Sequence, residues 1–213
     1  MSNVALLQFD DRDDQALYPL DRLAARNAAY AAAHGYEHIF IRSHPNLVPV
    51  FWHKLALIEQ ALANHEFVAW LDTDAVIHDL NLEIEKLFTG PEMMIFSGDL
   101  PIYPKPLAFN AGVFFCRGER ARALMREWAS LYPSQLWRKK DGRWNYADHK
   151  WAGPAYEQGS FAEKLLPKYE SQFRFLPWQL LQSPYPLAQS LTLHFANMFR
   201  PNAYLYINTE DTA

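Results

Sequence analysis

Two kinds of hydrophobic pattern alternate along the first part of the chain. Short, nearly continuous apolar runs are typical of strands buried on both faces of a parallel sheet, and they occur at residues 4–9 and 67–71. Residues 36–42, 93–97 and 112–116 predict further strands. Apolar positions with helical spacing occur at residues 20–34, 52–64 and 120–131. Gly35 follows the first of these stretches and suits a helix C-terminus. The alternation predicts an α/β fold with a mostly parallel central sheet flanked by helices.

The later part of the chain has a different character. Residues 132–186 contain many prolines and tryptophans and show weak periodicity, with a short helix predicted at residues 159–166. A short alternating segment, Leu191–Leu193, predicts a strand directly before His194. Neither a linker nor an internal repeat divides the chain. We therefore expect a single domain over residues 1–213, in which the later part builds the second wall of a cleft.

The most informative segment is a pair of carboxylates placed directly after a buried strand. Asp72 and Asp74 follow the apolar run at residues 67–71, and apolar residues resume immediately afterwards at Ala75. Two like charges at such a buried position are costly without a cation. Mg²⁺ or Mn²⁺ would resolve the cost, because these ions take carboxylate oxygens together with substrate phosphates. The alternative is that one aspartate caps a helix and the other is solvated.

Ligands of open α/β sheets bind at the carboxyl ends of the strands. The first strand ends in the polar loop at residues 10–14, so this loop and the Asp72–Asp74 pair should share one functional edge. The chain has no G-x-G-x-x-G segment after its first strand, which argues against a dinucleotide-binding protein.

Composition and charge limit which classes of ligand and which compartments are expected. The net charge is −4 and the densest basic segment, Arg138–Lys140, is too short to predict a nucleic-acid surface. An aromatic content of 15% suits sugar binding, although a large aromatic core is the favoured explanation for most of these residues. The single cysteine, Cys116, lies in an apolar run, which predicts a buried hydrophobe and a reducing compartment. With neither a signal peptide nor a membrane span, we expect a cytoplasmic protein, and peripheral membrane contact stays open.

Six segments of the chain, in the same order, resemble the GT-A fold glycosyltransferases, and among them the retaining galactosyl/xylosyl/mannosyltransferases of glycosyltransferase family 34. They lie at residues 27–36 (NAAYAAAHGY), 52–55 (WHKL), 70–75 (WLDTDA), 110–117 (NAGVFFCR), 156–161 (YEQGSF) and 193–196 (LHFA). Two positions depart from the family pattern. Glu157 stands where aspartate is more usual, and Ala196-Asn197 stands where a small residue and glycine are expected.

The resemblance implies a role for each of these segments. Residues 1–118 would form the nucleotide-sugar-binding half, and residues 119–213 would form the acceptor side and complete the metal site. The implied metal ligands are Asp72, Asp74 and His194. The implied catalytic residues are Glu157 and Gln158. The implied substrate-binding residues are Gln8, Asp10, Asp11, Lys54, Asn110, Ala111 and Gly112.

The same residues also have plain structural interpretations. His194 would be a satisfied core histidine, and Gly112 would form a bulge or tight turn. Glu157 would be an exposed acid at a helix start, and Lys54 would lie on a solvated helix face. If Glu157 lines the cleft instead, it can bind sugar hydroxyls or stabilise the positive charge that develops on the anomeric carbon.

The function that follows from the resemblance is a metal-dependent glycosyltransferase with Mn²⁺ or Mg²⁺ as cofactor. It would move a hexose or pentose, with retention, from a nucleoside-diphosphate sugar donor to a hydroxyl of a saccharide acceptor. UDP-sugars are favoured over GDP-sugars. A non-catalytic nucleotide-sugar-binding protein and a metal-dependent hydrolase remain the alternatives.

Overall fold

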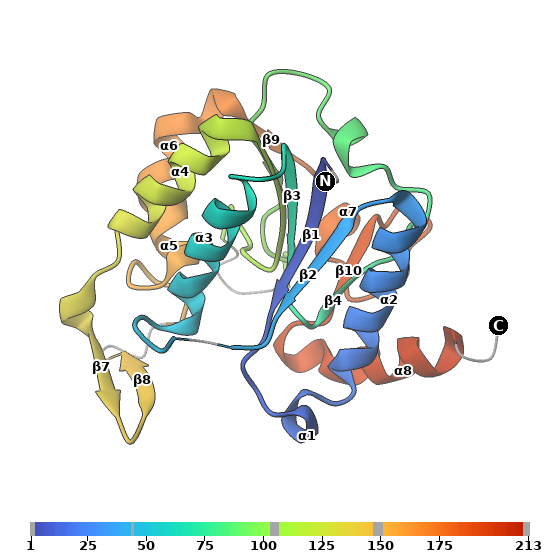
Figure 1. Cartoon of the computed structure of the whole chain (residues 1–213), viewed down its shortest axis with the longest axis horizontal. Coiled ribbons are helices and arrows are strands. Elements are labelled where there is room, and N and C mark those ends of the chain that lie inside the picture. The colour runs from blue at the N-terminus through green and yellow to red at the C-terminus, as the bar shows by residue number, and fades with distance from the viewer. Residues whose placement is uncertain (1–2, 44, 103–106, 147–150, 211–213) are drawn as a thin grey trace.

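A central sheet organises the molecule (Figure 1). The computed structural model describes residues 3–43, 45–102, 107–146 and 151–210. The sheet has six strands in the order β2-β1-β3-β6-β5-β9. Their bounds are β1 Val4–Phe9, β2 Glu37–Ile41, β3 Phe67–Leu71, β5 Met94–Phe96, β6 Val113–Arg117 and β9 Phe173–Phe175.

Strand direction decides which loops meet at the site. β1 runs parallel to β2 and to β3, and β5 runs parallel to β9. β6 is antiparallel to both of its neighbours, β3 and β5. The sheet is therefore mixed and mostly parallel, which confirms the predicted fold class. Because Leu71 pairs with Val113, the residues that precede β6 lie at the edge where β3 ends.

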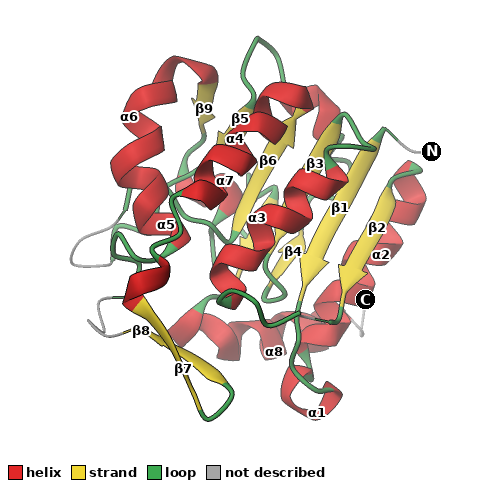
Figure 2. Cartoon of the chain, turned by 60° about the vertical axis from the view of Figure 1, so that its left-hand side comes forward, coloured by secondary structure: helices red, strands yellow, loops and turns green. Residues whose placement is uncertain are grey.

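Helices cover both faces of the sheet (Figure 2). One face packs against α3 (Val50–Ala61) and α4 (Gly118–Ser130), with a core that includes Trp52, Phe114 and Trp128. The other face packs against α2 (Leu20–His34). Successive residues of β1, such as Leu6 and Leu7, enter opposite cores because side chains alternate along a strand. An apolar run that is buried on both sides is the result expected from the sequence.

The principal elements agree with the predicted ones to within a few residues. The helix at residues 20–34 and the strands at residues 4–9 and 67–71 have the predicted bounds. Gly35 has a φ of 69° and its N–H donates to Ala32 O, so a left-handed residue ends α2 as predicted. The helix predicted at residues 52–64 begins two residues earlier, directly after Pro49. Cys116 is buried, and burial raises the pKa of its thiol, as expected for a small hydrophobe.

The later part of the chain contains a hairpin that the hydrophobic pattern did not predict. β7 (Trp137–Lys140) pairs antiparallel with β8 (Arg143–Tyr146). The turn between them is Asp141-Gly142, with φ values of 50° and 76°. Such a dipeptide with two positive φ values is a strong hairpin signal. The basic segment Arg138–Lys140 is exposed on this hairpin.

The remaining elements are short. The short helix predicted at residues 159–166 is present and is longer at both ends. It consists of α5 (Glu157–Ser160), a π-helical stretch (Phe161–Leu165) and α6 (Leu166–Tyr169). A small second sheet pairs β4 (Ala75–Ile77) with β10 (Thr192–His194). The other helices are α1 (Asp14–Leu17), α7 (Trp178–Leu181) and α8 (Arg200–Glu210). The 3₁₀ turns are Ile84–Leu87, Ser134–Leu136, Glu170–Gln172 and Asn197–Phe199.

Among the residues described, no helix combines the length and the apolar character that crossing a membrane would require.

Candidate metal centre and adjoining cleft

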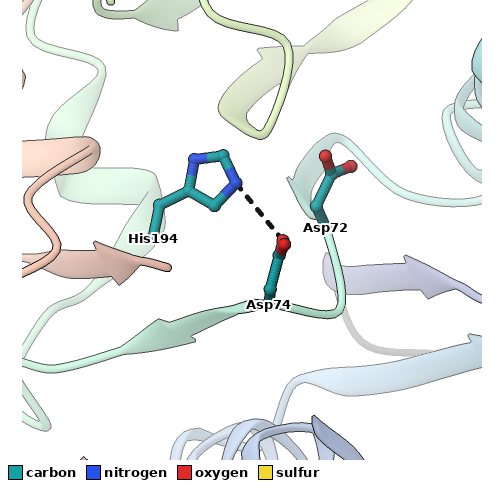
Figure 3. Close-up of side chains that lie close together, drawn as sticks. All are labelled: Asp72, Asp74 and His194. Carbon is teal, nitrogen blue, oxygen red and sulfur yellow. Dashed lines mark ion pairs between the residues drawn. The ribbon is translucent and has the colours of Figure 1, made fainter. Parts of the chain in front are cut away.

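The turn between β3 and β4 carries the two predicted carboxylates to a histidine from the other end of the chain. In the small sheet, Ala75 pairs with His194, so the imidazole lies beside the Asp72–Asp74 turn. One ligand atom from each of Asp72, Asp74 and His194 lies within 4.8 Å of the others (Figure 3). Two carboxylates and an imidazole form a donor set that suits a divalent first-row metal. The three residues predicted as metal ligands therefore converge.

Asp74 contacts both His194 and Arg200. His194 Nε2 lies 3.3 Å from Asp74 Oδ1, and Arg200 Nε lies 3.8 Å from Asp74 Oδ2. Burial alone would raise the pKa of Asp74, but His194 and Arg200 outweigh it and lower the pKa. Burial would likewise lower the pKa of His194, but Asp74 raises it. Nε2 is the ring nitrogen of His194 that lies toward the carboxylate. A divalent cation would fit the same place.

Asp72 is anchored from the side of the sheet. Its Oδ1 accepts hydrogen bonds from Trp70 Nε1 at 2.9 Å and from Lys54 Nζ at 3.3 Å. Lys54 is only 5% exposed, and its ammonium also contacts Glu157 Oε1 at 3.3 Å and Ala111 O at 3.1 Å. Burial would lower the pKa of Lys54, but Asp72 and Glu157 raise it. Lys54 is therefore a buried bridge between two site carboxylates, and the solvated helix face is wrong.

The predicted catalytic pair lies at the start of α5. Glu157 is 3% exposed, and burial raises its pKa even though Lys54 opposes the shift. Gln158 Oε1 accepts a hydrogen bond of 3.0 Å from Ala111 N. Both residues line the same cavity as the metal-site residues. The alternative interpretation of Glu157 as an exposed acid at a helix start is wrong.

The loop before β6 is shaped by Asn110 and Gly112. Asn110 Oδ1 accepts from Gly112 N at 2.8 Å, and Asn110 Nδ2 donates to Asp99 Oδ1 at 2.8 Å. A Cβ atom on Gly112 would lie 2.7 Å from both ring nitrogens of His194, and nearer still to Cε1. Glycine is therefore needed here because the imidazole occupies the space that a side chain would take.

The predicted residues at the end of β1 divide into two groups. Gln8 is completely buried. Its Oε1 accepts a hydrogen bond from Asn27 Nδ2, and its Nε2 donates to Asp72 O at 3.4 Å. Asp10 is buried against Arg12 and accepts a 2.6 Å hydrogen bond from Thr73 Oγ1. Burial would raise the pKa of Asp10, but Arg12 outweighs it and lowers the pKa. Gln8 and Asp10 thus support the metal-site turn from behind, whereas Asp11 is exposed and lines a cavity.

Two cavities adjoin one another at this edge. The larger, about 920 Å³, brings together nine of the residues predicted from sequence, namely Lys54, Asp72, Asp74, Asn110, Ala111, Gly112, Glu157, Gln158 and His194. The smaller, about 410 Å³, is lined by Asp11 and Arg42 from the sheet edge and by Trp137, Arg143 and Trp144 from the hairpin. Phe51 lines both cavities, so it lies at their boundary.

Three residues of the site were missed by the sequence analysis. Arg200 and Trp151 line the larger cavity, and Gln182 contacts His194 from behind. Arg200 could have been recognised from the sequence, because Pro201 favours a helix start at this point. A cation at a helix N-terminus is unfavourable unless an anion binds nearby, so Arg200 indicates an anion site. Gln182 and Trp151 carried none, because their role depends on which segments pack beside them.

Comparisons with known proteins match the first part of the chain in sequence. Residues 4–98 match the sequence profile of the galactosyl transferase GMA12/MNN10 family. The probable alpha-1,2-galactosyltransferase gmh1 of Schizosaccharomyces pombe is 31% identical over 78 residues, which are 35% of this chain and 24% of that protein. The chain thus aligns with about a quarter of this curated relative. The matches at residues 110–117, 156–161 and 193–196 lie outside the profile and stay predictions.

Solved structures resemble the whole chain. A glycosyltransferase involved in the glycosylation of the major capsid of PBCV-1 superposes with a TM-score of 0.74 at 17% identity, covering 97% of this chain and 98% of that one. Drosophila beta-1,4-galactosyltransferase 7, solved in complex with manganese, UDP-Gal and xylobiose, superposes with a TM-score of 0.51 at 14% identity, covering 93% and 73%. At these identities the comparison shows the fold, which is that of GT-A glycosyltransferases.

Proposed function

We propose that this chain, whose residues 4–98 match the profile of the galactosyl transferase GMA12/MNN10 family and whose fold is that of GT-A glycosyltransferases, is a metal-dependent glycosyltransferase. It transfers a sugar from a nucleoside-diphosphate donor to a saccharide hydroxyl. The observation that carries the proposal is the convergence of Asp72, Asp74 and His194 on a cavity that also contains Glu157 and Gln158.

Asp72, Asp74 and His194 would hold Mn²⁺ or Mg²⁺. When bound, such an ion neutralises the charge that develops on the leaving diphosphate. Arg200 supplies a second positive charge, since its side chain is half exposed, lies 3.8 Å from Asp74 and lines the cavity. We assign the diphosphate to the part of the cavity that Arg200, Asp72 and Asp74 line. The Drosophila structure, with its manganese and UDP-Gal, supports Mn²⁺ and a UDP-sugar as the first pair to test.

The nucleoside would extend from the diphosphate toward the smaller cavity. Asp11 and Arg42 line that cavity at the ends of β1 and β2, where α/β sheets bind ligands. Trp137 and Trp144 of the hairpin form its other side. A volume of about 410 Å³ lies within the usual range for a small-molecule site.

The donor sugar would lie between the loop before β6 and the start of α5. Gln158 already uses its Oε1 to accept from Ala111 N, so its amide N–H groups are the part directed to sugar hydroxyls. The buried Glu157 carboxylate, paired with Lys54, stands near the position where positive charge develops on the anomeric carbon. Retention of configuration belongs to this proposal through the resemblance to family 34.

The acceptor would bind on the wall formed by the later part of the chain. Trp151 lines the larger cavity and is 60% exposed. Phe51 and Tyr156 pack against its ring, with centroids 5.3 and 5.0 Å away. A fixed, exposed indole in a cavity wall is a suitable surface for the C–H face of a saccharide.

The experiment that tests the proposal is calorimetric titration of UDP and GDP, each with and without Mn²⁺, followed by turnover of the matching nucleotide-sugars. The proteins are wild type, Asp72→Ala, Asp74→Ala and Asp21→Ala, an exposed aspartate on α2 as the control. We expect binding that requires the metal and both site aspartates. Sugar release to water alone would favour a hydrolase, and binding without turnover would favour a non-catalytic protein. Absence of binding under all conditions would refute the donor site.

A further inference from the structure

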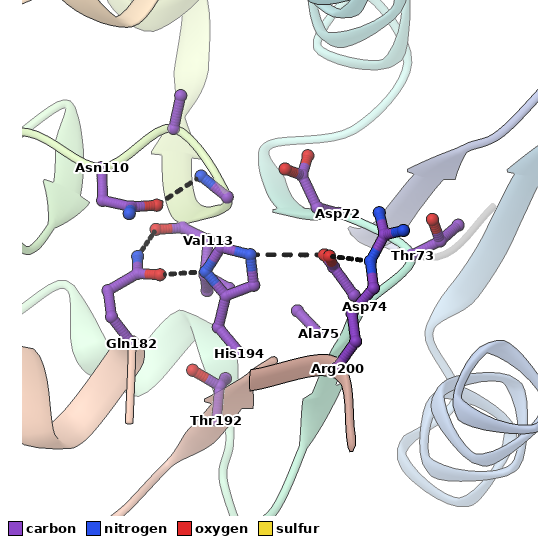
Figure 4. Close-up of polar contacts among 12 residues, drawn as sticks. Asp72, Thr73, Asp74, Ala75, Asn110, Val113, Gln182, Thr192, His194 and Arg200 are labelled. Atoms are coloured by element: carbon purple, nitrogen blue, oxygen red, sulfur yellow. Dashed lines mark hydrogen bonds and ion pairs between the residues drawn. The ribbon is translucent and has the colours of Figure 1, made fainter. Parts of the chain in front are cut away.

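The ring of His194 is held from behind by a glutamine that no sequence motif includes. Gln182 follows α7 and is completely buried. Its Oε1 lies 2.6 Å from His194 Nδ1, and its Nε2 donates to Val113 O at 3.1 Å (Figure 4). The glutamine amide thus joins the first residue of β6 to the imidazole that faces the Asp72–Asp74 turn.

The chemistry of these groups leaves one arrangement of hydrogens. A backbone carbonyl only accepts, so the amide nitrogen of Gln182 must face Val113 O. The amide oxygen then faces the ring, and it too only accepts. His194 Nδ1 must therefore carry a hydrogen, and Nε2 is the nitrogen that faces Asp74. The orientation of the Gln182 amide is therefore not a free choice between two alternatives. The backbone carbonyl of Val113, which can only accept, fixes it.

The backbone on both sides of Gln182 is tied to the strand that carries the histidine. Thr192 Oγ1 donates to Leu181 O at 2.6 Å, and His194 N donates to Ser183 O at 2.9 Å. The glutamine and the histidine are therefore held at a fixed separation. On the other side, Gly112 leaves space that the ring fills. Rotation of the imidazole is restricted from both directions.

We propose that Gln182 is a positioning residue of the metal centre. It keeps the proton of His194 on Nδ1, so that Nε2 is the ring atom directed at the metal held by Asp72 and Asp74. The inference rests on the proposed function, because it assumes that His194 is a ligand. Hydrogen-bond partners of ligating histidines typically contribute 10–100-fold to metal affinity.

The first test is calorimetric titration of Mn²⁺ into wild type, Gln182→Met and Gln179→Met. Methionine keeps the length of the side chain and removes both hydrogen bonds. Gln179 lies in α7, three residues before Gln182, and is partly exposed, so it is the matched control. We expect Gln182→Met to weaken Mn²⁺ binding about 10–100-fold and the control to leave it unchanged. Equal affinity of the two variants would overturn the proposal.

The second test needs no variant and no activity. We would record ¹⁵N NMR spectra of the histidine ring nitrogens in the metal-free wild type and after addition of Mg²⁺, which is diamagnetic. We expect His194 Nδ1 to be protonated in both spectra and the metal-induced shift to fall on Nε2. An unprotonated Nδ1, or a shift centred on Nδ1, refutes the role of Gln182. If the wild type bound no metal, the proposed function would fail, while the metal-free spectrum would still decide the state of Nδ1.

Discussion

The ligands of the proposed metal centre come from two regions that hold them in different ways. We call these regions the carboxylate route (β3 with Asp72 and Asp74) and the histidine route (β10 with His194). Asp72 and Asp74 follow β3, which is paired along its length with β1 on one side and β6 on the other. His194 lies on β10, a three-residue strand paired with β4, and Ser183 forms a single bridge on its other side. The carboxylates therefore inherit the rigidity of the central sheet. The ring of His194 is instead held by a contact with Gln182 and by the space that Gly112 leaves for it. We expect substitutions to act differently on the two routes.

The largest effect should come from the carboxylate route. Asp74→Asn keeps the shape of the side chain but removes the charge that pairs with His194 and Arg200. We expect metal-dependent nucleotide binding to disappear and kcat/KM to fall about a thousandfold, because the metal contributes several kcal/mol to the transition state. Initial-rate kinetics with UDP-galactose would measure it. A variant that keeps wild-type kcat/KM would show that Asp74 is not a ligand.

Metal addition tests whether the carboxylates that follow β3 and the histidine on β10 bind the same ion. Because the ligands come from β3–β4 and from β10, only the folded protein binds the ion with full affinity. At a Mn²⁺ concentration about 100 times Kd, we expect about 2.7 kcal/mol of added stability, lost on chelation. The gain should shrink as pH falls, since Asp74 raises the pKa of His194 and a proton on Nε2 competes with the metal. Thermal unfolding with and without Mn²⁺ measures it, and no shift would contradict a shared ion.

Gly112→Ala tests the histidine route alone. The added Cβ would lie 2.7 Å from both ring nitrogens and displace the imidazole, while Asp72 and Asp74 keep their strand. We expect Mn²⁺ affinity to fall about 10–100-fold, similar to the loss of a hydrogen-bond partner of the ring. In a His194→Ala background the same substitution should have little further effect, because the ring it displaces is gone. Additive losses in the double variant would contradict this mechanism.

Trp151→Ala tests the acceptor wall. Loss of one exposed aromatic face should cost about 1–2 kcal/mol of acceptor binding, which is an increase of roughly tenfold in acceptor KM. Donor binding should not change, because the proposed contacts of the diphosphate are Arg200 and the metal-site carboxylates. Tyr204→Ala removes an aromatic ring of similar exposure from α8 and serves as the control. An increase in donor KM instead would move Trp151 to the donor subsite.

The smallest effect concerns Asn197, which stands where the resemblance to family 34 leads us to expect glycine. Asn197 has a φ of 53°, a left-handed conformation that glycine and asparagine tolerate best. We expect Asn197→Ala to lower the free energy of unfolding by about 1 kcal/mol and Asn197→Gly to change it less. Urea denaturation of both variants measures the difference. A fully stable alanine variant would mean that the turn relaxes to a negative φ.

Much of the site was recognisable from short stretches of sequence. The strand before Asp72, the abrupt carboxylate pair and the return of apolar residues at Ala75 are local patterns, and they led directly to the metal-site turn. The hairpin at Asp141-Gly142 was recognisable in the same way from its turn residues. It was missed because both of its strands are rich in charged and aromatic residues, which hides the alternation expected of a half-buried strand.

The sequence by itself determined most strands of the central sheet, the three long helices that flank it and the carboxylate turn, because hydrophobic periodicity and turn chemistry act between neighbouring residues. Only the tertiary structure decided that β6 runs antiparallel to β3, that Lys54 lies buried between Asp72 and Glu157, and that Gln182 turns the His194 ring toward Asp74. These contacts join residues far apart in the chain. Each depends on the burial of both partners in one packed arrangement, and no local pattern encodes that arrangement.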